Sequence, residues 1–129
     1  LRLATRAAAV AAAYDGPVAL KSFDPQVVAA LRELCPTIPR GIVAETTQDD
    51  PVYAALPPSM RLALSDVLHF AETRPDFLSW RVDDLPCAPT YLCRLLGRIP
   101  VMAWTVRTVD QRAQAAAHAD QMVFEGFVP

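Results

Sequence analysis

The sequence lacks a surplus of charge of either sign and lacks a long apolar run, and each absence argues against a class of protein. Its 12 lysines and arginines are balanced by 14 acidic residues, so the formal net charge is only −2. Such a chain has no broad basic surface for nucleic acid or acidic lipid. No apolar run approaches the roughly 20 residues of a membrane-spanning helix. We therefore expect neither a nucleic-acid-binding protein nor a membrane span.

Cysteine is scarce and its spacing matches no metal-binding or redox motif. Cys35, Cys87 and Cys93 form no Cys-x-x-Cys pair, and neither histidine lies near them at metal-ligand spacing. An odd number of widely spaced cysteines is typical of free structural thiols in a reducing compartment. We expect a cytoplasmic protein without a disulfide or a cysteine-bound metal.

The amino-terminal segment also lacks a secretory signal pattern. Residues 1–13 contain Arg2, Arg6 and many alanines but no continuous leucine-type apolar segment, and the first residue is not methionine. This pattern favours a helix that is cut at its upstream end over a signal peptide.

What the chain does contain is a regular alternation of apolar runs and helical patterns. At 129 residues, 53% hydrophobic and only 20% charged, it is suited to one domain with a buried core. A helix is expected first, over residues 2–14. Five short apolar runs predict strands, at residues 18–23, 40–45, 77–82, 98–106 and 122–124.

Four further helices are predicted between these strands. Asp24-Pro25 is a strong helix start, with Asp24 as the N-cap, and Pro89 opens a short helix that Gly97 should cap. Thr108 and Gln111 have capping-box spacing ahead of an alanine-rich helix. The remaining helix should run from residue 59 to residue 73, with Leu62, Val67, Leu68 and Phe70 as its core contacts.

Strands of this kind, separated by helices, predict an α/β fold with a parallel sheet covered by helices. Right-handed crossovers are the default for such units. The pattern leaves two architectures open, which are a doubly wound open sheet and part of a barrel.

Three segments resemble the later strand motifs of glycerophosphodiester phosphodiesterases. They are Lys-Ser-Phe-Asp-Pro at residues 21–25, Pro-Val-Met-Ala-Trp-Thr-Val at 100–106, and Asp-Gln-Met-Val-Phe-Glu-Gly at 120–126. Their order and spacing match the family over residues 18–129. The resemblance implies a partial (β/α)8 TIM barrel of about five parallel strands, family strands 4 to 8, with covering helices. Residues 1–129 would then be the C-terminal part of a single phosphodiesterase barrel domain.

The family's catalytic motifs are missing from this sequence. These are an early His-Arg-Gly, a Glu-x-Asp pair, a His-Asp motif and a third-strand Glu with a nearby Lys, all of which would lie upstream of Leu1. The resemblance implies hydrolysis of glycerophosphodiesters to glycerol 3-phosphate and an alcohol, with a divalent metal, Mg²⁺ or Ca²⁺. We expect no catalytic residue and no metal ligand in this chain, which should be inactive alone.

The resemblance does suggest substrate-binding residues, because a barrel builds its site at the carboxyl ends of its strands. Trp104 is the best candidate for a wall of the glycerol pocket, the alternative being ordinary barrel filling. Ser22 and Phe23 could line the mouth. Lys21 stands where the family more often has a small or apolar residue, and could reach the phosphate or point toward the helices. Phe124-Glu125 stands where the family usually carries Thr-Asp, so a carboxylate is retained one methylene longer.

Other polar residues are more ambiguous. Glu45 and Arg81 lie at the ends of predicted strands, and the sequence leaves open whether they face the site. His69 and His118 fall on predicted helices, which lie outside a barrel, so we expect structural or solvated roles for them. Asp83-Asp84 follows a strand without a third ligand at suitable spacing and is interpreted as a solvated turn.

Two alternatives to a phosphodiesterase portion remain at this point. One is a degenerate, non-catalytic fragment, and the other is an unrelated doubly wound α/β binding domain. Five strands of a barrel would leave two open edges and an uncovered interior face, so self-association of the isolated chain is also expected.

Overall fold

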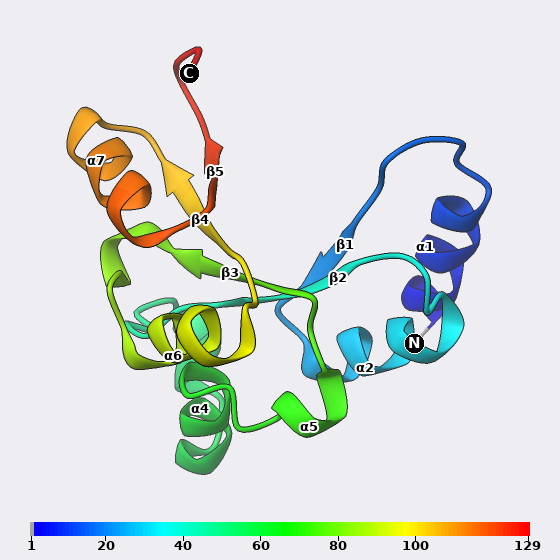
Figure 1. The fold of residues 1–129 in the computed structure, drawn as a ribbon. Coiled ribbons are helices and arrows are strands. Elements are labelled where there is room, and N and C mark those ends of the chain that lie inside the picture. Colours follow the sequence, from blue (N-terminus) through cyan, green and yellow to red (C-terminus); the bar gives the residue numbers. More distant parts are fainter. Residues whose placement is uncertain (1) are drawn as a thin grey trace.

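The computed structural model describes residues 2–129, in which five parallel strands form one sheet (Figure 1). The strands are β1 (Leu20–Ser22), β2 (Arg40–Ala44), β3 (Phe77–Arg81), β4 (Val101–Val106) and β5 (Gln121–Phe124). The helices are α1 (Arg2–Ala12), α2 (Pro25–Leu34), α3 (Pro51–Ala54), α4 (Pro58–Ser65), α5 (Phe70–Thr73), α6 (Ala88–Gly97) and α7 (Val109–His118), with a 3-10 turn, η1 (Val82–Asp84).

The strand order decides between the two architectures that the sequence left open. Each strand pairs in parallel with the next one along the chain, in the order β1-β2-β3-β4-β5. A doubly wound sheet reverses its strand order at a switch point, whereas a barrel does not. The fold is therefore an α/β fold with the architecture of a partial (β/α)8 barrel.

One face of the sheet carries the main hydrophobic core. Parallel pairing brings Ile42 level with Leu78, and Leu78 level with Val101, so these three side chains point the same way. They are fully buried together with Trp80. Helices α2 and α7 cover this face and contribute, among others, Val28 and Ala115 to the same core cluster.

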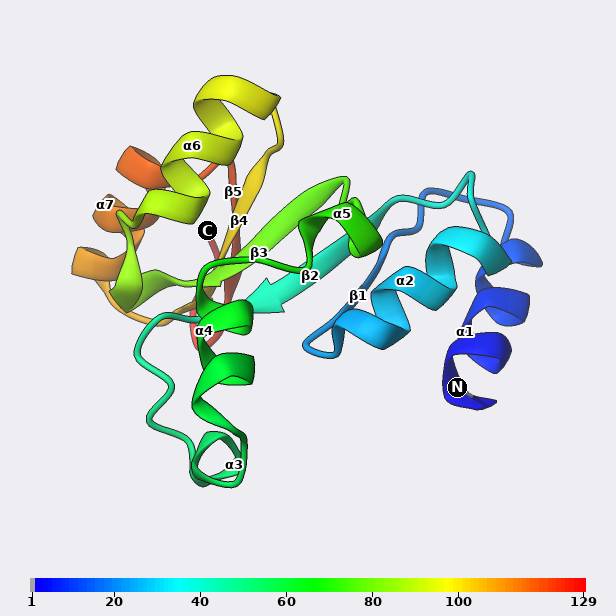
Figure 2. The same cartoon turned by 90° about the horizontal axis from the view of Figure 1, so that it is seen from below.

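A second, smaller core joins α1 to α2. Three alanines of α1, Ala4, Ala8 and Ala11, are buried, at the helical spacing that places them on one side. They pack with Leu31 and its neighbours at the end of α2. Figure 2 shows α1 alongside α2 at the β1 end of the sheet.

The opposite face of the sheet would be the interior of a complete barrel. Ser79 and Met102 are level with each other on β3 and β4, one residue out of phase with the core positions. Lys21 reaches this face from β1, where its Nζ donates to Ser79 Oγ at 3.1 Å. Gly41 on β2 is level with Lys21 on one side and Phe77 on the other, and a Cβ at this position would come within 2.3 Å of the Phe77 ring. The missing side chain is what allows Phe77 to cover β2.

Predicted helix ends are largely confirmed where a side-chain cap defines them. Asp24 accepts a hydrogen bond from the Gln26 backbone N–H at the start of α2. Thr108 and Gln111 form the reciprocal capping box of α7. Gly97, in contrast, is the last residue of α6, and Arg98 takes the left-handed cap position with φ 52°. That part of the prediction was wrong by one residue.

The single helix expected over residues 59–73 was also wrong. The chain forms α4 and α5 separately, because Val67 has a left-handed φ of 56° and interrupts the helix between them. The break buries Val67 and packs Phe70 on the core, while Leu62 and Leu68 remain 53% and 63% exposed. A short helix, α3, also forms in the loop after β2, and Figure 2 shows α3 and α4 as one excursion from that strand's end.

Within residues 2–129, no helix combines the length and the apolar character needed to span a bilayer.

Candidate functional site

A polar pocket of about 350 Å³ opens at the carboxyl ends of the strands. We call it the mouth pocket. Its lining comes from the last residues of β3 and β4 and from the segments that follow β1 to β4, which meet because parallel strands end at the same edge of a sheet. The lining residues are Phe23, Glu45, Asp49, Asp50, Arg81, Asp83, Trp104, Thr105 and Arg107.

Two of the residues singled out by the sequence meet in this pocket. The rings of Phe23 and Trp104 form an edge-to-face pair, with centroids 5.6 Å apart and an interplanar angle of 82°. Trp104 Nε1 donates a hydrogen bond of 2.9 Å to the Ser79 carbonyl oxygen, which orients the indole. Trp104 is partly exposed and Phe23 is exposed, so a ligand can reach both rings.

Lys21 points to the face of the sheet opposite the main core, where Ser79 and Met102 lie, and not toward the helices. Besides Ser79 Oγ, its Nζ lies 3.9 Å from Met102 Sδ. Partial burial lowers the pKa of Lys21 from its ordinary value. The Lys21 ammonium group therefore lies on the face of the sheet that would be the barrel interior, beside the strands that lead to the mouth pocket.

Ser22 takes a different position from its neighbours. Its register partner is Ile42, whose side chain belongs to the helix-covered core. Its Oγ accepts a hydrogen bond of 3.1 Å from the Asp24 N–H, in the turn that begins α2. The structure therefore does not bring Ser22 together with Phe23 and Trp104.

A charged network that the sequence left undecided forms one wall of the mouth pocket. Arg81 Nη1 contacts Glu45 Oε2 at 3.3 Å and Asp49 Oδ1 at 2.8 Å. Glu45 is only 7% exposed. The hydrogen bond from Arg81 lowers the pKa of Asp49, and the hydrogen bond to Asp49 raises the pKa of Arg81. Burial and then hydrogen bonding to Glu45 raise the pKa of Tyr53, which stays protonated and can donate to that carboxylate.

The acidic pair after β3 was interpreted from the sequence as a solvated turn, but both carboxylates accept hydrogen bonds from other segments. Asp84 accepts hydrogen bonds from the backbone N–H groups of Thr46 and Thr47, at 2.7 and 3.0 Å, and from the Thr47 hydroxyl. Asp83 accepts from Gln111 Nε2 at 2.9 Å. These bonds tie the loops after β2 and β3 to each other and to α7.

Glu125 is not part of the mouth-pocket lining but pairs with Arg107, which is. Arg107 Nη2 approaches Glu125 Oε2 at 2.8 Å, and both side chains are more than half exposed. An exposed pair of this kind adds little stability, so its effect on the pocket is to neutralise the charge of Arg107.

The carboxylates at this end of the sheet do not fit a divalent metal. Glu45, Asp49, Asp83 and Asp84 already accept hydrogen bonds from Arg81, Gln111 or backbone N–H groups. Across residues 2–129, no three histidine, cysteine, aspartate or glutamate side chains come together as a metal site. Hard cations need several free oxygen ligands at once, and this set cannot supply them without breaking its ion pairs.

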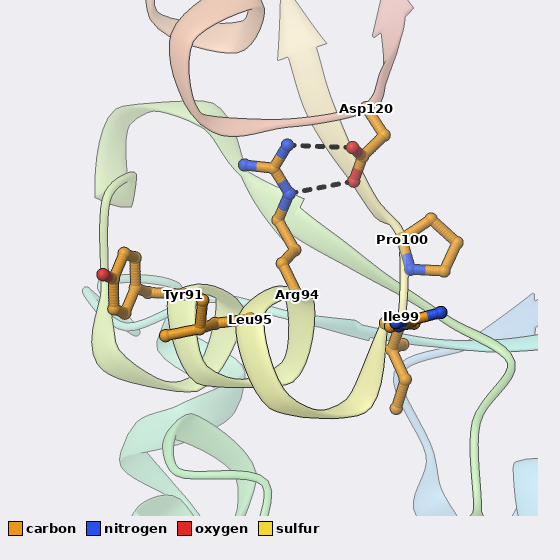
Figure 3. A pocket seen from close by; sticks show the side chains of 7 residues that line it. Tyr91, Arg94, Leu95, Ile99, Pro100 and Asp120 are labelled. Atoms are coloured by element: carbon orange, nitrogen blue, oxygen red, sulfur yellow. Dashed lines mark hydrogen bonds and ion pairs between the residues drawn. The ribbon is translucent and has the colours of Figure 1, made fainter.

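Another hollow, of about 400 Å³, lies at the other end of the strands, and an ion pair crosses it (Figure 3). Arg94 Nε and Nη2 donate to the two Asp120 carboxylate oxygens at 3.0 and 2.8 Å. Asp120 also accepts from the Val101 N–H. Burial would raise the pKa of Asp120, but these hydrogen bonds outweigh it and lower the pKa. In a barrel this end serves stability, so we assign the pair a structural role.

Comparison with known proteins shows a similarity in fold. No family model matches the sequence, and no curated protein matches it. The fold is similar to a solved structure from Silicibacter pomeroyi DSS-3 with the provisional name glycerophosphoryl diester phosphodiesterase, with a TM-score of 0.57 and 18% sequence identity. The match covers 82% of this chain but only 33% of that one. At this identity the similarity shows the fold, and the chain spans about a third of that structure's length.

Proposed function

We propose that residues 1–129 are the C-terminal part of a single phosphodiesterase barrel domain. In its complete form this barrel would hydrolyse glycerophosphodiesters to glycerol 3-phosphate and an alcohol. The observation that carries the proposal is the Phe23–Trp104 pair at the carboxyl ends of sequentially ordered barrel strands. The structural similarity to a protein provisionally named as such a phosphodiesterase supports it.

In this proposal the chain binds and orients substrate without performing the chemistry. Trp104 and Phe23 pack against the glycerol moiety, and Lys21 supplies a positive charge for the phosphate from the barrel interior. Ser22 contributes by forming the turn that positions Phe23. A divalent metal, Mg²⁺ or Ca²⁺, would be held by residues outside this chain, because the carboxylates described above are already paired.

Binding of glycerophosphocholine, followed by tryptophan fluorescence, tests this proposal. Trp104 should respond to the ligand, whereas Trp80 is fully buried on the other face and serves as the internal reference. Lys21→Met should weaken binding about tenfold, the loss expected for one hydrogen bond to a charged group. Trp104→Ala should abolish the fluorescence response and the binding measured by calorimetry.

Two controls accompany this measurement. Leu62→Gln, on the exposed side of α4, should bind as the wild type does. The chain should release no glycerol 3-phosphate with either metal. If glycerophosphocholine gave no calorimetric signal with the folded wild-type chain, the proposed binding function would be wrong. Metal-dependent hydrolysis by the chain alone would contradict the assignment of catalysis to residues outside it.

We also propose that the isolated chain self-associates. Within residues 2–129, β1 and β5 each have a pairing partner on one side only, and large apolar side chains such as Leu3, Leu95 and Leu96 are exposed. Unpaired strand edges and exposed apolar surface favour association. Sedimentation velocity should detect dimers or larger species, and a monodisperse monomer at micromolar concentration would contradict this prediction.

We also propose a cytoplasmic location, on the basis of the cysteines. All three cysteines are free thiols in the structure, as suits a reducing compartment.

A further inference from the structure

Helix α6 carries its large apolar side chains on the side that faces away from the sheet. Tyr91, Leu92, Leu95 and Leu96 are 61%, 47%, 61% and 76% exposed. Their spacing places all four on one side of the helix, which we call the α6 face. The buried residue of this helix is the small Thr90, on the opposite side. A contiguous apolar face of this kind in water is typical of an interaction surface.

Completion of a barrel would not cover the α6 face. Helix α6 connects β3 to β4, the third and fourth of the five strands in sheet order. Further strands can pair only at the free edges of β1 and β5, and their helices would lie beside them. Figure 2 shows α6 far from α1, which lies at the β1 end of the sheet. The α6 face therefore needs a partner from outside the barrel.

The α6 face is large enough for contact with a second copy of the chain. Its four side chains expose about 500 Å², so a symmetric contact would bury about 1,000 Å² in total, the lower limit for a specific interface. We therefore expect a weak dimer and not a permanent one.

The two ends of the α6 face complement each other. Tyr91 lies in the first half of the helix, and Arg98 follows its last residue in a left-handed conformation. Arg98 is exposed and forms no salt bridge within residues 2–129. In an antiparallel pair of α6 helices, Arg98 of each copy would meet the Tyr91 ring of the other. A guanidinium group over an aromatic ring is a favourable contact.

The hollow crossed by the Arg94–Asp120 ion pair adjoins the α6 face. Tyr91, Leu95 and Arg98 belong both to this face or its end and to the lining of the hollow (Figure 3). A side chain of a second copy can enter there. Side chains seated in such pockets supply most of the binding free energy of protein interfaces.

A lipid surface fits these observations less well. Helices that bind at a bilayer surface carry several lysines or arginines on their polar side. On α6, Arg94 is already paired with Asp120, which leaves Arg98 as the available cation. The formal net charge of −2 gives the chain no general attraction to an acidic bilayer.

We propose that the α6 face is the interface of a symmetric dimer, in which the α6 helices of two copies pack antiparallel around a twofold axis near Leu95. The inference does not depend on the proposed enzymatic function. It also differs from association through the strand edges, because β1 and β5 are different edges and their contact can continue from copy to copy. A contact that uses the same patch on both copies closes at two.

Sedimentation equilibrium on the full chain tests the inference. Leu95→Glu combined with Leu96→Glu should raise the dimer Kd at least about 100-fold, because each dimer loses four buried leucine side chains. Leu3→Glu combined with Val10→Glu is the matched control, since it adds the same charge at exposed positions of α1 and should keep the wild-type Kd. Circular dichroism establishes that both variants are folded.

A substitution at the end of the face tests the antiparallel arrangement. Arg98→Glu should raise the dimer Kd about tenfold, because the contact with Tyr91 is made twice in each dimer. Arg98→Lys keeps the positive charge and should have a smaller effect.

Cross-linking locates the twofold axis. A residue on the axis lies next to its own copy, so Leu95→Cys should give a disulfide-linked dimer on mild oxidation. Leu3→Cys, on α1, should not. The wild-type chain, with its three free cysteines, provides the background.

Three results would overturn the inference. One is a dimer Kd that Leu95→Glu with Leu96→Glu leaves unchanged, and another is a wild-type chain that stays monomeric at its highest soluble concentration. The third is a monomer that binds phosphatidylcholine–phosphatidylglycerol vesicles through the α6 face, with binding lost in the same double variant. Glycerophosphocholine binding tests the proposed function separately, so either proposal can fail without the other.

Discussion

Replacing Trp80 with alanine is expected to lower the free energy of unfolding by about 3–5 kcal/mol. Trp80 is fully buried in the main core, and its Nε1 donates to Thr46 Oγ1 at 3.3 Å. The loss combines the transfer of a large apolar group with the cavity that remains. Because small domains are stable by only about 5–15 kcal/mol, this one substitution removes a large part of the total.

The matched variant is Trp104→Ala, on the opposite face of the sheet. Trp104 is partly exposed, so its removal should cost clearly less stability while abolishing ligand binding. Urea unfolding monitored by far-ultraviolet circular dichroism measures both variants with the same probe. Equal losses of stability in the two variants would show that Trp104 is ordinary core filling and would refute its role as a pocket wall.

Replacing Arg81 with methionine is the substitution with the second largest expected effect. In this variant Glu45, which is 7% exposed in the wild-type structure, would keep its hydrogen bond with Tyr53 but lose its cationic partner. Breaking a fully buried pair costs roughly 3–5 kcal/mol, and we expect about 2 kcal/mol here because the Arg81 side chain is 25% exposed. The midpoint of urea unfolding should fall accordingly.

The double variant Arg81→Met with Glu45→Gln shows whether an unpaired carboxylate causes that loss. Removing the buried charge together with its partner should recover much of the stability, because the amide needs no counter-charge. If the double variant were as unstable as the sum of the two single variants, the packing of Arg81 and not its charge would explain the effect.

Local features of this fold were predictable from short stretches of sequence. Four of the strands lie within the apolar runs that predicted them, and β5 begins one residue before its run, because a strand buried on a parallel sheet must be apolar over several residues. The starts of α2 and α7 follow from caps in which a side chain bonds to a backbone N–H two or three residues away. The break at Val67 was not predictable in this way, since a β-branched residue in a left-handed conformation is held there by packing and not by its own preference.

The candidate site depended on contacts between distant segments. Phe23 and Trp104 were each recognised from family-like motifs, but their edge-to-face contact joins segments 81 residues apart in the chain. Glu45 and Arg81 stayed undecided because a shift of one residue in a strand turns its side chains to the other face. The cavity between the start of α2, the end of β2 and the helices α3 and α4 gave no sequence signal, since no local pattern encodes how those segments are placed.

By itself, therefore, the sequence determined where the strands and the side-chain-capped helices α2 and α7 form, since propensity, hydrophobic period and capping act over a few neighbouring residues. The tertiary structure alone decided the strand order, the inward direction of Lys21, the turn-forming position of Ser22 and the pairing of the mouth carboxylates. These depend on strand register and on contacts between segments far apart in the chain, and only the assembled sheet defines them.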